Sequence, residues 1–79
     1  MVTPESIEQG IAAGLSCERV EVVGDGQHFQ ALVVSSAFAG RSRVQRHQLV
    51  YAALGERMRE EIHALSMKTV TPGELASGG

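Results

Sequence analysis

The chain is poor in cysteine and aromatic residues: its 79 residues hold one cysteine, two phenylalanines, one tyrosine and no tryptophan. Because Cys17 has no second cysteine to pair with, an intrachain disulfide and an all-cysteine metal or cluster site are excluded. No apolar run approaches the roughly 20 residues that a membrane-spanning helix needs. The N-terminus lacks a charged region followed by an apolar stretch, so we expect no signal peptide. These absences favour a cytoplasmic protein that makes no membrane contact.

A basic excess is also missing. Seven Lys and Arg residues against nine Asp and Glu residues give a formal net charge of −2. Proteins that bind nucleic acid mainly through phosphates are usually basic, so such binding would need a local patch here. Paired catalytic carboxylates, a nucleophile elbow and a phosphate-binding loop are absent from the sequence. We therefore expect no catalytic residues and no enzymatic activity.

A chain of this length has room for one domain with a small, mainly aliphatic core. We expect a single domain over residues 1–79, with an ordered core from about 3 to 75 and a flexible C-terminal tail. Thr3-Pro4 is typical of a helix start, with a capping hydroxyl followed by a proline at the first helical position. The apolar residues that follow recur every four positions: Ile7, Ile11 and Leu15.

Two segments rich in β-branched residues follow the first helix. Arg19–Val23 and Phe29–Ser35 have the length and composition of strands, and Gly24-Asp25-Gly26-Gln27 between them suits a tight turn. Alternating residues predict a third strand over Ile62–Val70. Thr71-Pro72 predicts the start of a short final helix.

A second helix should begin after Ser42, a favourable cap, and Gly55 should interrupt or end it. One arc of this helix is predicted to be buried; it comprises Val44, His47, Val50, Tyr51, Leu54 and Met58. The element order is therefore α-β-β-α-β-α. A hairpin followed by a right-handed crossover gives a three-stranded mixed sheet with helices on one face, an α+β fold.

The three histidines are the candidate ligands. His28 and His63 each open a predicted strand, and adjacent parallel strands would bring their N-terminal ends to one edge of the sheet. Neutral imidazole suits Zn, Cu and Fe, so a metal or cluster site is one interpretation. Two unconnected histidines at the surface are the other. His47, within the apolar arc, is better explained as a packed structural residue.

Arg41, Arg43 and Arg46 form the one basic cluster, near the start of the second helix. They could bind phosphate, DNA, RNA or an acidic partner, since a helix N-terminus favours anions. Alternatively, they form a solvated surface. We expect Cys17 to be packed or solvent-facing rather than reactive.

Two segments resemble the signature of the BolA family. Phe38–Tyr51 resembles its Phe-x-Gly turn and the Arg-His pair that opens the following helix, and Ile62–Thr69 with Thr71-Pro72 resembles its third strand and last helix start. The loop segment Gly24–Phe29 is most similar to the IbaG branch. The resemblance covers about Pro4 to Leu75 and implies a fold related to the type II KH domain. Phe38 and Gly40 would then have structural roles.

The resemblance also implies a function. Members partner monothiol glutaredoxins through a bridging [2Fe-2S] cluster, which is not expected in the isolated protein. His63 matches the family-wide ligand and His28 the loop-borne one, while the partner's cysteine and glutathione would supply the other two. The chain would then be a non-enzymatic adaptor in iron–sulfur trafficking or stress response, a monomer or weak homodimer when alone.

BolA relatives are also described as stress-linked transcription regulators. The alternative function is therefore DNA binding through Arg41, Arg43 and Arg46. The sequence lacks the Gly-x-x-Gly loop with which KH domains clamp a nucleic-acid backbone, which weakens a KH-type mode of binding. Gly73 and Leu75 replace an acidic and an aromatic residue of the family, which predicts a weaker last helix with looser docking.

Overall fold

The computed structural model describes residues 2–62 and 64–77, with side chains omitted for residues 57–61. The His63 side chain and the end of the predicted flexible tail, residues 78 and 79, lie outside the described residues. The elements follow the predicted order: α1 (Pro4–Gly14), β1 (Arg19–Gly24), β2 (His28–Val34), the 3₁₀ turn η1 (Ser36–Phe38), α2 (Arg43–Glu61), β3 (Ala64–Val70) and α3 (Pro72–Ala76).

In the described part of the chain, each α-helix begins after a residue whose side-chain hydroxyl caps it. Thr3 caps α1 by accepting a hydrogen bond from the N–H of Ser6. Ser42 accepts from the N–H of Gln45 at 3.2 Å, while the Gln45 side chain accepts from the N–H of Ser42 at 2.9 Å. These reciprocal bonds satisfy N–H groups that have no partner within the helix. Gly55 interrupts α2 as predicted, with φ of 82°.

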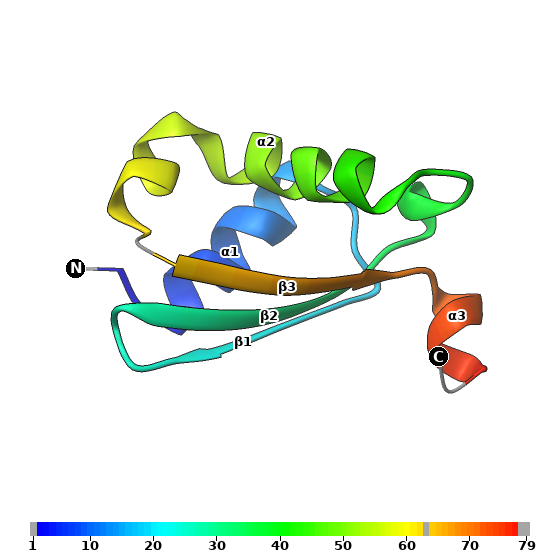
Figure 1. Cartoon of the computed structure of the whole chain (residues 1–79), viewed down its shortest axis with the longest axis horizontal. Helices are drawn as coiled ribbons and strands as arrows, with labels where there is room; N and C mark the ends of the chain where they lie inside the picture. Colours follow the sequence, from blue (N-terminus) through cyan, green and yellow to red (C-terminus); the bar gives the residue numbers. More distant parts are fainter. Residues whose placement is uncertain (1, 63, 78–79) are drawn as a thin grey trace.

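The sheet is three-stranded and mixed, with β2 in the centre (Figure 1). β1 and β2 are antiparallel, with Arg19 opposite Val34 and Gly24 opposite Phe29. β2 and β3 are parallel, with His28 opposite Ala64. This register places the beginnings of β2 and β3 at one end of the sheet and the beginning of β1 at the other.

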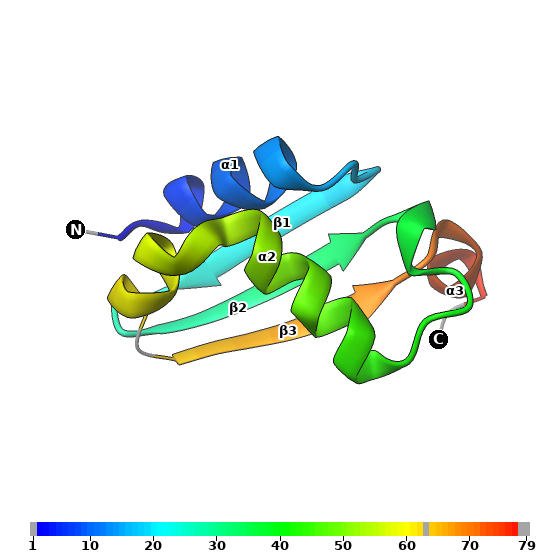
Figure 2. The ribbon, with the colours of Figure 1, turned by 90° about the horizontal axis from the view of Figure 1, so that it is seen from above.

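Helices α1 and α2 cover one face of the sheet, and α3 lies at the end where β3 finishes (Figures 1 and 2). The inner face of β2 is apolar, and burying one such large side chain contributes about 1.5–3 kcal/mol. The fully or almost fully buried large side chains come from both helices, β2 and the 3₁₀ turn: Phe29, Phe38, Ile7, Ile11, Val33, Val34 and Val50. The core is mainly aliphatic, as the composition predicted.

The predicted buried arc of α2 is correct in its middle and wrong at its start. Val50 and Leu54 are buried, whereas Val44 is 65% exposed. The reason is the path of α2, whose first turns project past β3 before the helix crosses the sheet toward α1 (Figure 2). A helical wheel assumes that neighbouring elements cover one face of the helix equally along its whole length. Met58, also predicted on this arc, lies outside the residues whose side chains are described.

None of the described helices combines the length and the apolar character that crossing a lipid bilayer would require.

Candidate functional site

The hairpin turn between β1 and β2 holds the first candidate residue in place. The Asp25 carboxylate accepts hydrogen bonds from the backbone N–H groups of His28 at 2.8 Å and Gln27 at 2.9 Å. These two bonds hold the pKa of the Asp25 carboxyl below its usual range. Gly26 has φ of 101°, a conformation that glycine adopts without strain. The turn is therefore built around Asp25.

His28 is the first residue of β2 and is displayed to solvent. Its side chain is 76% exposed, and its Nδ1 lies 4.0 Å from the second carboxylate oxygen of Asp25. Across the sheet it is opposite Ala64, the first residue of β3. The sequence predicts that the His28 and His63 rings lie at the same edge of the sheet. Because His63 lies outside the described part of the chain, this stays a prediction.

Within residues 2–62 and 64–77, no group of three or more His, Cys, Asp or Glu side chains could hold a metal ion together. One exposed imidazole nitrogen can ligate a metal but cannot complete a coordination shell.

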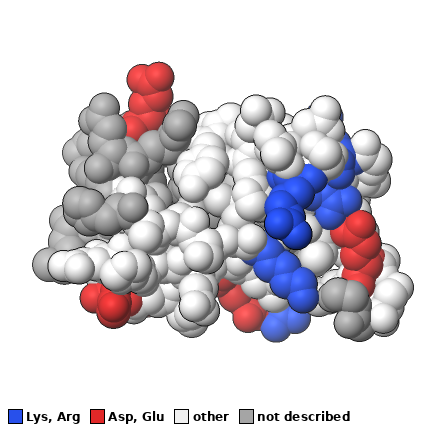
Figure 3. All heavy atoms as spheres, in the orientation of Figure 1, with Lys and Arg blue, Asp and Glu red and all other residues white. Residues whose placement is uncertain are grey.

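A second candidate surface is a basic hollow between the start of α2, β3 and α3, with a volume of about 790 Å³. Lys and Arg side chains gather over the start of α2 and the neighbouring part of β3 (Figure 3). The residues that line the hollow are Arg41, Arg43, Arg46, His47, Met67, Lys68, Thr69, Val70 and Glu74. The structure thus brings the three predicted arginines to one surface and adds Lys68, which sequence reasoning missed.

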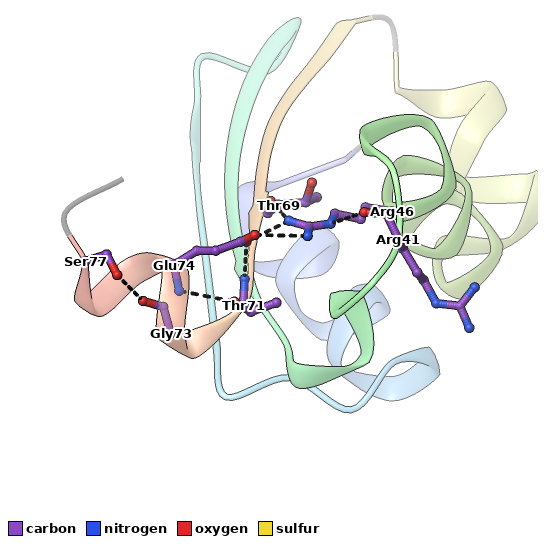
Figure 4. Close-up of polar contacts among 7 residues, drawn as sticks. All are labelled: Arg41, Arg46, Thr69, Thr71, Gly73, Glu74 and Ser77. Carbon is purple, nitrogen blue, oxygen red and sulfur yellow. Dashed lines mark hydrogen bonds and ion pairs between the residues drawn. The ribbon is translucent and has the colours of Figure 1, made fainter.

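Arg46 differs from its two neighbours because its guanidinium is bound within the protein (Figure 4). It donates two hydrogen bonds to the Glu74 carboxylate, at 2.7 and 3.1 Å. It also donates to the backbone carbonyl of Thr69 at 3.0 Å and lies 5.8 Å from the ring centre of Phe38. Only 13% of the Arg46 side chain is exposed. Arg46 therefore joins α2 to β3 and α3.

The partner of Arg46 has a perturbed acidity. The guanidinium, followed by the N–H of Thr71 at 2.8 Å, lowers the pKa of Glu74 to about 2. Glu74 also forms a capping box with Thr71, which begins α3. α3 has no buried side chain, and these polar contacts attach it to α2 and β3.

Arg41 and Arg43 are exposed. The Nε of Arg41 donates to the carbonyl of Ala37 at 3.1 Å, while its guanidinium end points away from the Arg46 contacts (Figure 4). Lys68 is exposed on β3. Among the described residues that line the hollow, these three side chains are the exposed cations, and they are the part of it that can meet an anionic ligand.

The sequence predicts structural roles for three further residues. Phe38 is fully buried, Gly40 has φ of 74°, and His47 is half-buried in the lining of the hollow. The half-buried Cys17 thiol donates to the carbonyl of Leu15 at 3.3 Å. Burial and the neighbouring Glu18 raise the pKa of the Cys17 thiol, which disfavours the reactive thiolate.

The element order and the three-stranded mixed sheet define a small α+β protein. A family model described as BolA-like protein matches residues 10–74. The chain therefore belongs to the BolA family.

Within this family the chain resembles IbaG. It is 44% identical to the acid stress protein IbaG of Escherichia coli K12 over 71 residues, which are 89% of this chain and 84% of that protein. Its structure matches that of a BolA homologue from Coxiella burnetii with a TM-score of 0.85 and 51% identity, covering 96% of this chain and 99% of the other. It also matches the BolA domain of SufE1 from Arabidopsis thaliana with a TM-score of 0.76 and 31% identity, covering 90% and 93%.

Proposed function

We propose that the protein is a non-enzymatic adaptor that binds a monothiol glutaredoxin and shares a [2Fe-2S] cluster with it through His28 and His63. The proposed role is iron–sulfur trafficking or stress response. The names of two relatives agree with these roles: one is called an acid stress protein, and another is a SufE-like protein with a BolA domain.

The observation that carries the proposal is the position of His28. This imidazole is exposed at the tip of the hairpin, on a turn that Asp25 fastens through two backbone N–H groups. Opposite it, β3 begins at Ala64, and His63 precedes Ala64 in the sequence by one peptide bond. Neighbouring strands lie about 5 Å apart, which supports a shared role for the two histidines.

The chain's own thiol is a poor candidate for a third ligand. Cys17 precedes β1, whose first residue pairs with Val34, at the opposite end of the sheet from His28. Its thiol also has a raised pKa, whereas ligation requires a thiolate. In the proposal, thiolate ligands therefore come from a partner, which supports a glutaredoxin with glutathione.

When bound, the cluster would supply an exposed, transferable iron–sulfur centre whose charge and potential histidine ligation shifts relative to all-thiolate binding. The chain would contribute two neutral imidazoles, and Asp25 would act as a positioning residue for the one in the loop. His28 needs little rearrangement to bind, because its turn is already hydrogen-bonded.

The test is co-purification with a monothiol glutaredoxin in the presence of glutathione, followed by absorption and visible circular dichroism spectra. We predict a coloured heterodimer whose spectrum differs from that of the glutaredoxin homodimer. His63→Ala and His28→Ala should each abolish or shift that spectrum, whereas the control His47→Ala should preserve it. An unchanged spectrum in both ligand variants would reject the assignment.

DNA binding, the alternative function, has weaker support. Of its three arginines, Arg46 is bound to Glu74 and Thr69, so the exposed cations are Arg41, Arg43 and Lys68. A chain with a net charge of −2 also repels a polyanion at long range.

A further inference from the structure

The outer edge of β3 has backbone groups that are not used by the sheet. The carbonyl of Val70 accepts from the N–H of Ser35, so the backbone of Val70 faces β2. Backbone direction alternates along a strand, and therefore Leu65, Met67 and Thr69 direct their N–H and C=O groups away from β2. Within the described part of the chain, only the Thr69 carbonyl among these has a hydrogen-bond partner, the Arg46 guanidinium.

The basic hollow runs along this edge. Four consecutive residues, Met67 to Val70, line it, although their side chains alternate between the two faces of the sheet. A single hollow can reach all four only from the side of the strand. The first turns of α2 project past this edge (Figure 2). Arg43 is the first residue of α2, Arg41 lies two residues before it, and both line the hollow.

Among the described residues that line the hollow, the charges without an ion-pair partner are positive. Arg41, Arg43 and Lys68 are exposed, and the acidic residue of the hollow, Glu74, is paired with Arg46. An unpaired strand edge is a template for an added strand, and lysine or arginine beside it discourages strands that do not carry negative charge.

We propose that the outer edge of β3 binds an extended acidic segment of a partner protein as a fourth strand. Backbone groups of Leu65 and Met67 pair with the segment, and Arg41, Arg43 and Lys68 meet its carboxylates. The site goes beyond the cluster-sharing function. Its part at Met67–Val70 lies about 10–20 Å along β3 from Ala64, the residue opposite His28.

The edge favours a peptide over two other occupants. A peptide strand supplies both donors and acceptors to the alternating N–H and C=O groups, whereas a phosphate backbone supplies acceptors alone. A second copy joined edge to edge would bring the same arginines and Lys68 against each other, which like-charge repulsion opposes.

The test is fluorescence anisotropy with a labelled peptide of alternating glutamate and valine. Its comparisons are the lysine–valine peptide and an oligothymidylate of equal charge. We expect binding of the acidic peptide to the full chain, weakened about tenfold by the double substitution Arg41→Ala with Arg43→Ala. Arg19→Ala, which removes an exposed arginine on β1 at the other edge of the sheet, should leave the affinity within about twofold.

Strand pairing has a signature that charge attraction lacks. On binding, the amides of Leu65, Met67 and Thr69 should gain protection from hydrogen exchange, while those of Ser66 and Lys68, already bonded to β2, should change little. A peptide N-methylated at alternate residues, on the side that faces β3, should lose binding to the unaltered protein.

Four results would overturn the proposal. These are retained binding of the N-methylated peptide, peptide binding unaffected by the double arginine variant, oligothymidylate binding without acidic-peptide binding, and a dimer through this edge that the peptide cannot displace. The cluster-sharing function is tested separately, because none of these variants alters His28 or His63.

Discussion

At the scale of single residues, the pair of Arg46 and Glu74 shows what the sequence could not reveal. Arg46 stands among Arg41 and Arg43 in the chain, and this context predicts a ligand-binding role for all three. Its partner Glu74 lies 28 positions later in sequence. Only the approach of α3 to α2 distinguishes a structural arginine from two exposed ones.

The lowered pKa of Glu74 predicts a loss of stability in acid. A carboxyl whose pKa is lower in the folded chain stabilises the fold above its ordinary pKa of about 4.3, and this contribution disappears as the pH falls toward its folded value. That folded value is about 2. The folded chain should therefore lose stability progressively between about pH 5 and pH 2.

Glu74→Gln tests this prediction. The variant should be less stable than the unaltered chain at pH 7, and the difference should shrink as the pH is lowered through this range. Urea denaturation at a series of pH values measures this difference in the free energy of unfolding. Glu56→Gln, at an exposed carboxylate of α2, serves as the control. A stability difference that stays constant from pH 7 to pH 2 would contradict the assigned ion pair.

At the scale of elements, periodicity and capping residues predicted the helices, the hairpin and the mixed sheet. The observed strand boundaries differ from the predicted ones where strand pairing determines them. β2 begins at His28 rather than Phe29, because His28 pairs with Ala64. Exposure of Val44 was not predictable, because a helical wheel contains no information on where the neighbouring sheet ends.

The crossing of α1 and α2 depends on a glycine at the end of α1. A Cβ atom on Gly14 would lie 2.6 Å from the Cα of Ala53 and 2.8 Å from its carbonyl oxygen. Because these atoms are largely backbone, the helices would have to separate. Gly14→Ala should therefore destabilise the fold by about 1–3 kcal/mol.

Gly73 in α3 provides a matched comparison, since a Cβ atom there would have its nearest neighbour, the Thr71 hydroxyl, at 3.9 Å. Gly73→Ala should be neutral or stabilising by up to about 1 kcal/mol, because alanine is the better helix former. Chemical denaturation of both variants measures the difference. Equal effects of the two substitutions would show that the helix crossing does not require a glycine.

In the whole molecule, the two candidate surfaces lie at different parts of the sheet. The exposed His28 marks the end where β2 and β3 begin, and the basic hollow follows the later half of β3. The sequence predicted His28 and the arginines as site residues from their motifs. It could not locate the hollow, because Lys68 is distant from the arginines in the sequence. Lys68 lines the same hollow because the first turns of α2 project past β3. The net charge of −2 gives no indication of this local basic surface.

In the proposed function, two imidazoles of this chain bind a cluster whose remaining ligands come from a partner. Pulsed electron paramagnetic resonance of the reduced heterodimer with a monothiol glutaredoxin tests it most directly, because nitrogen bound to iron gives resolved hyperfine couplings. We predict couplings from two histidine nitrogens, one of which disappears in His28→Ala and the other in His63→Ala. A reduced cluster without histidine nitrogen couplings in the unaltered heterodimer would contradict it.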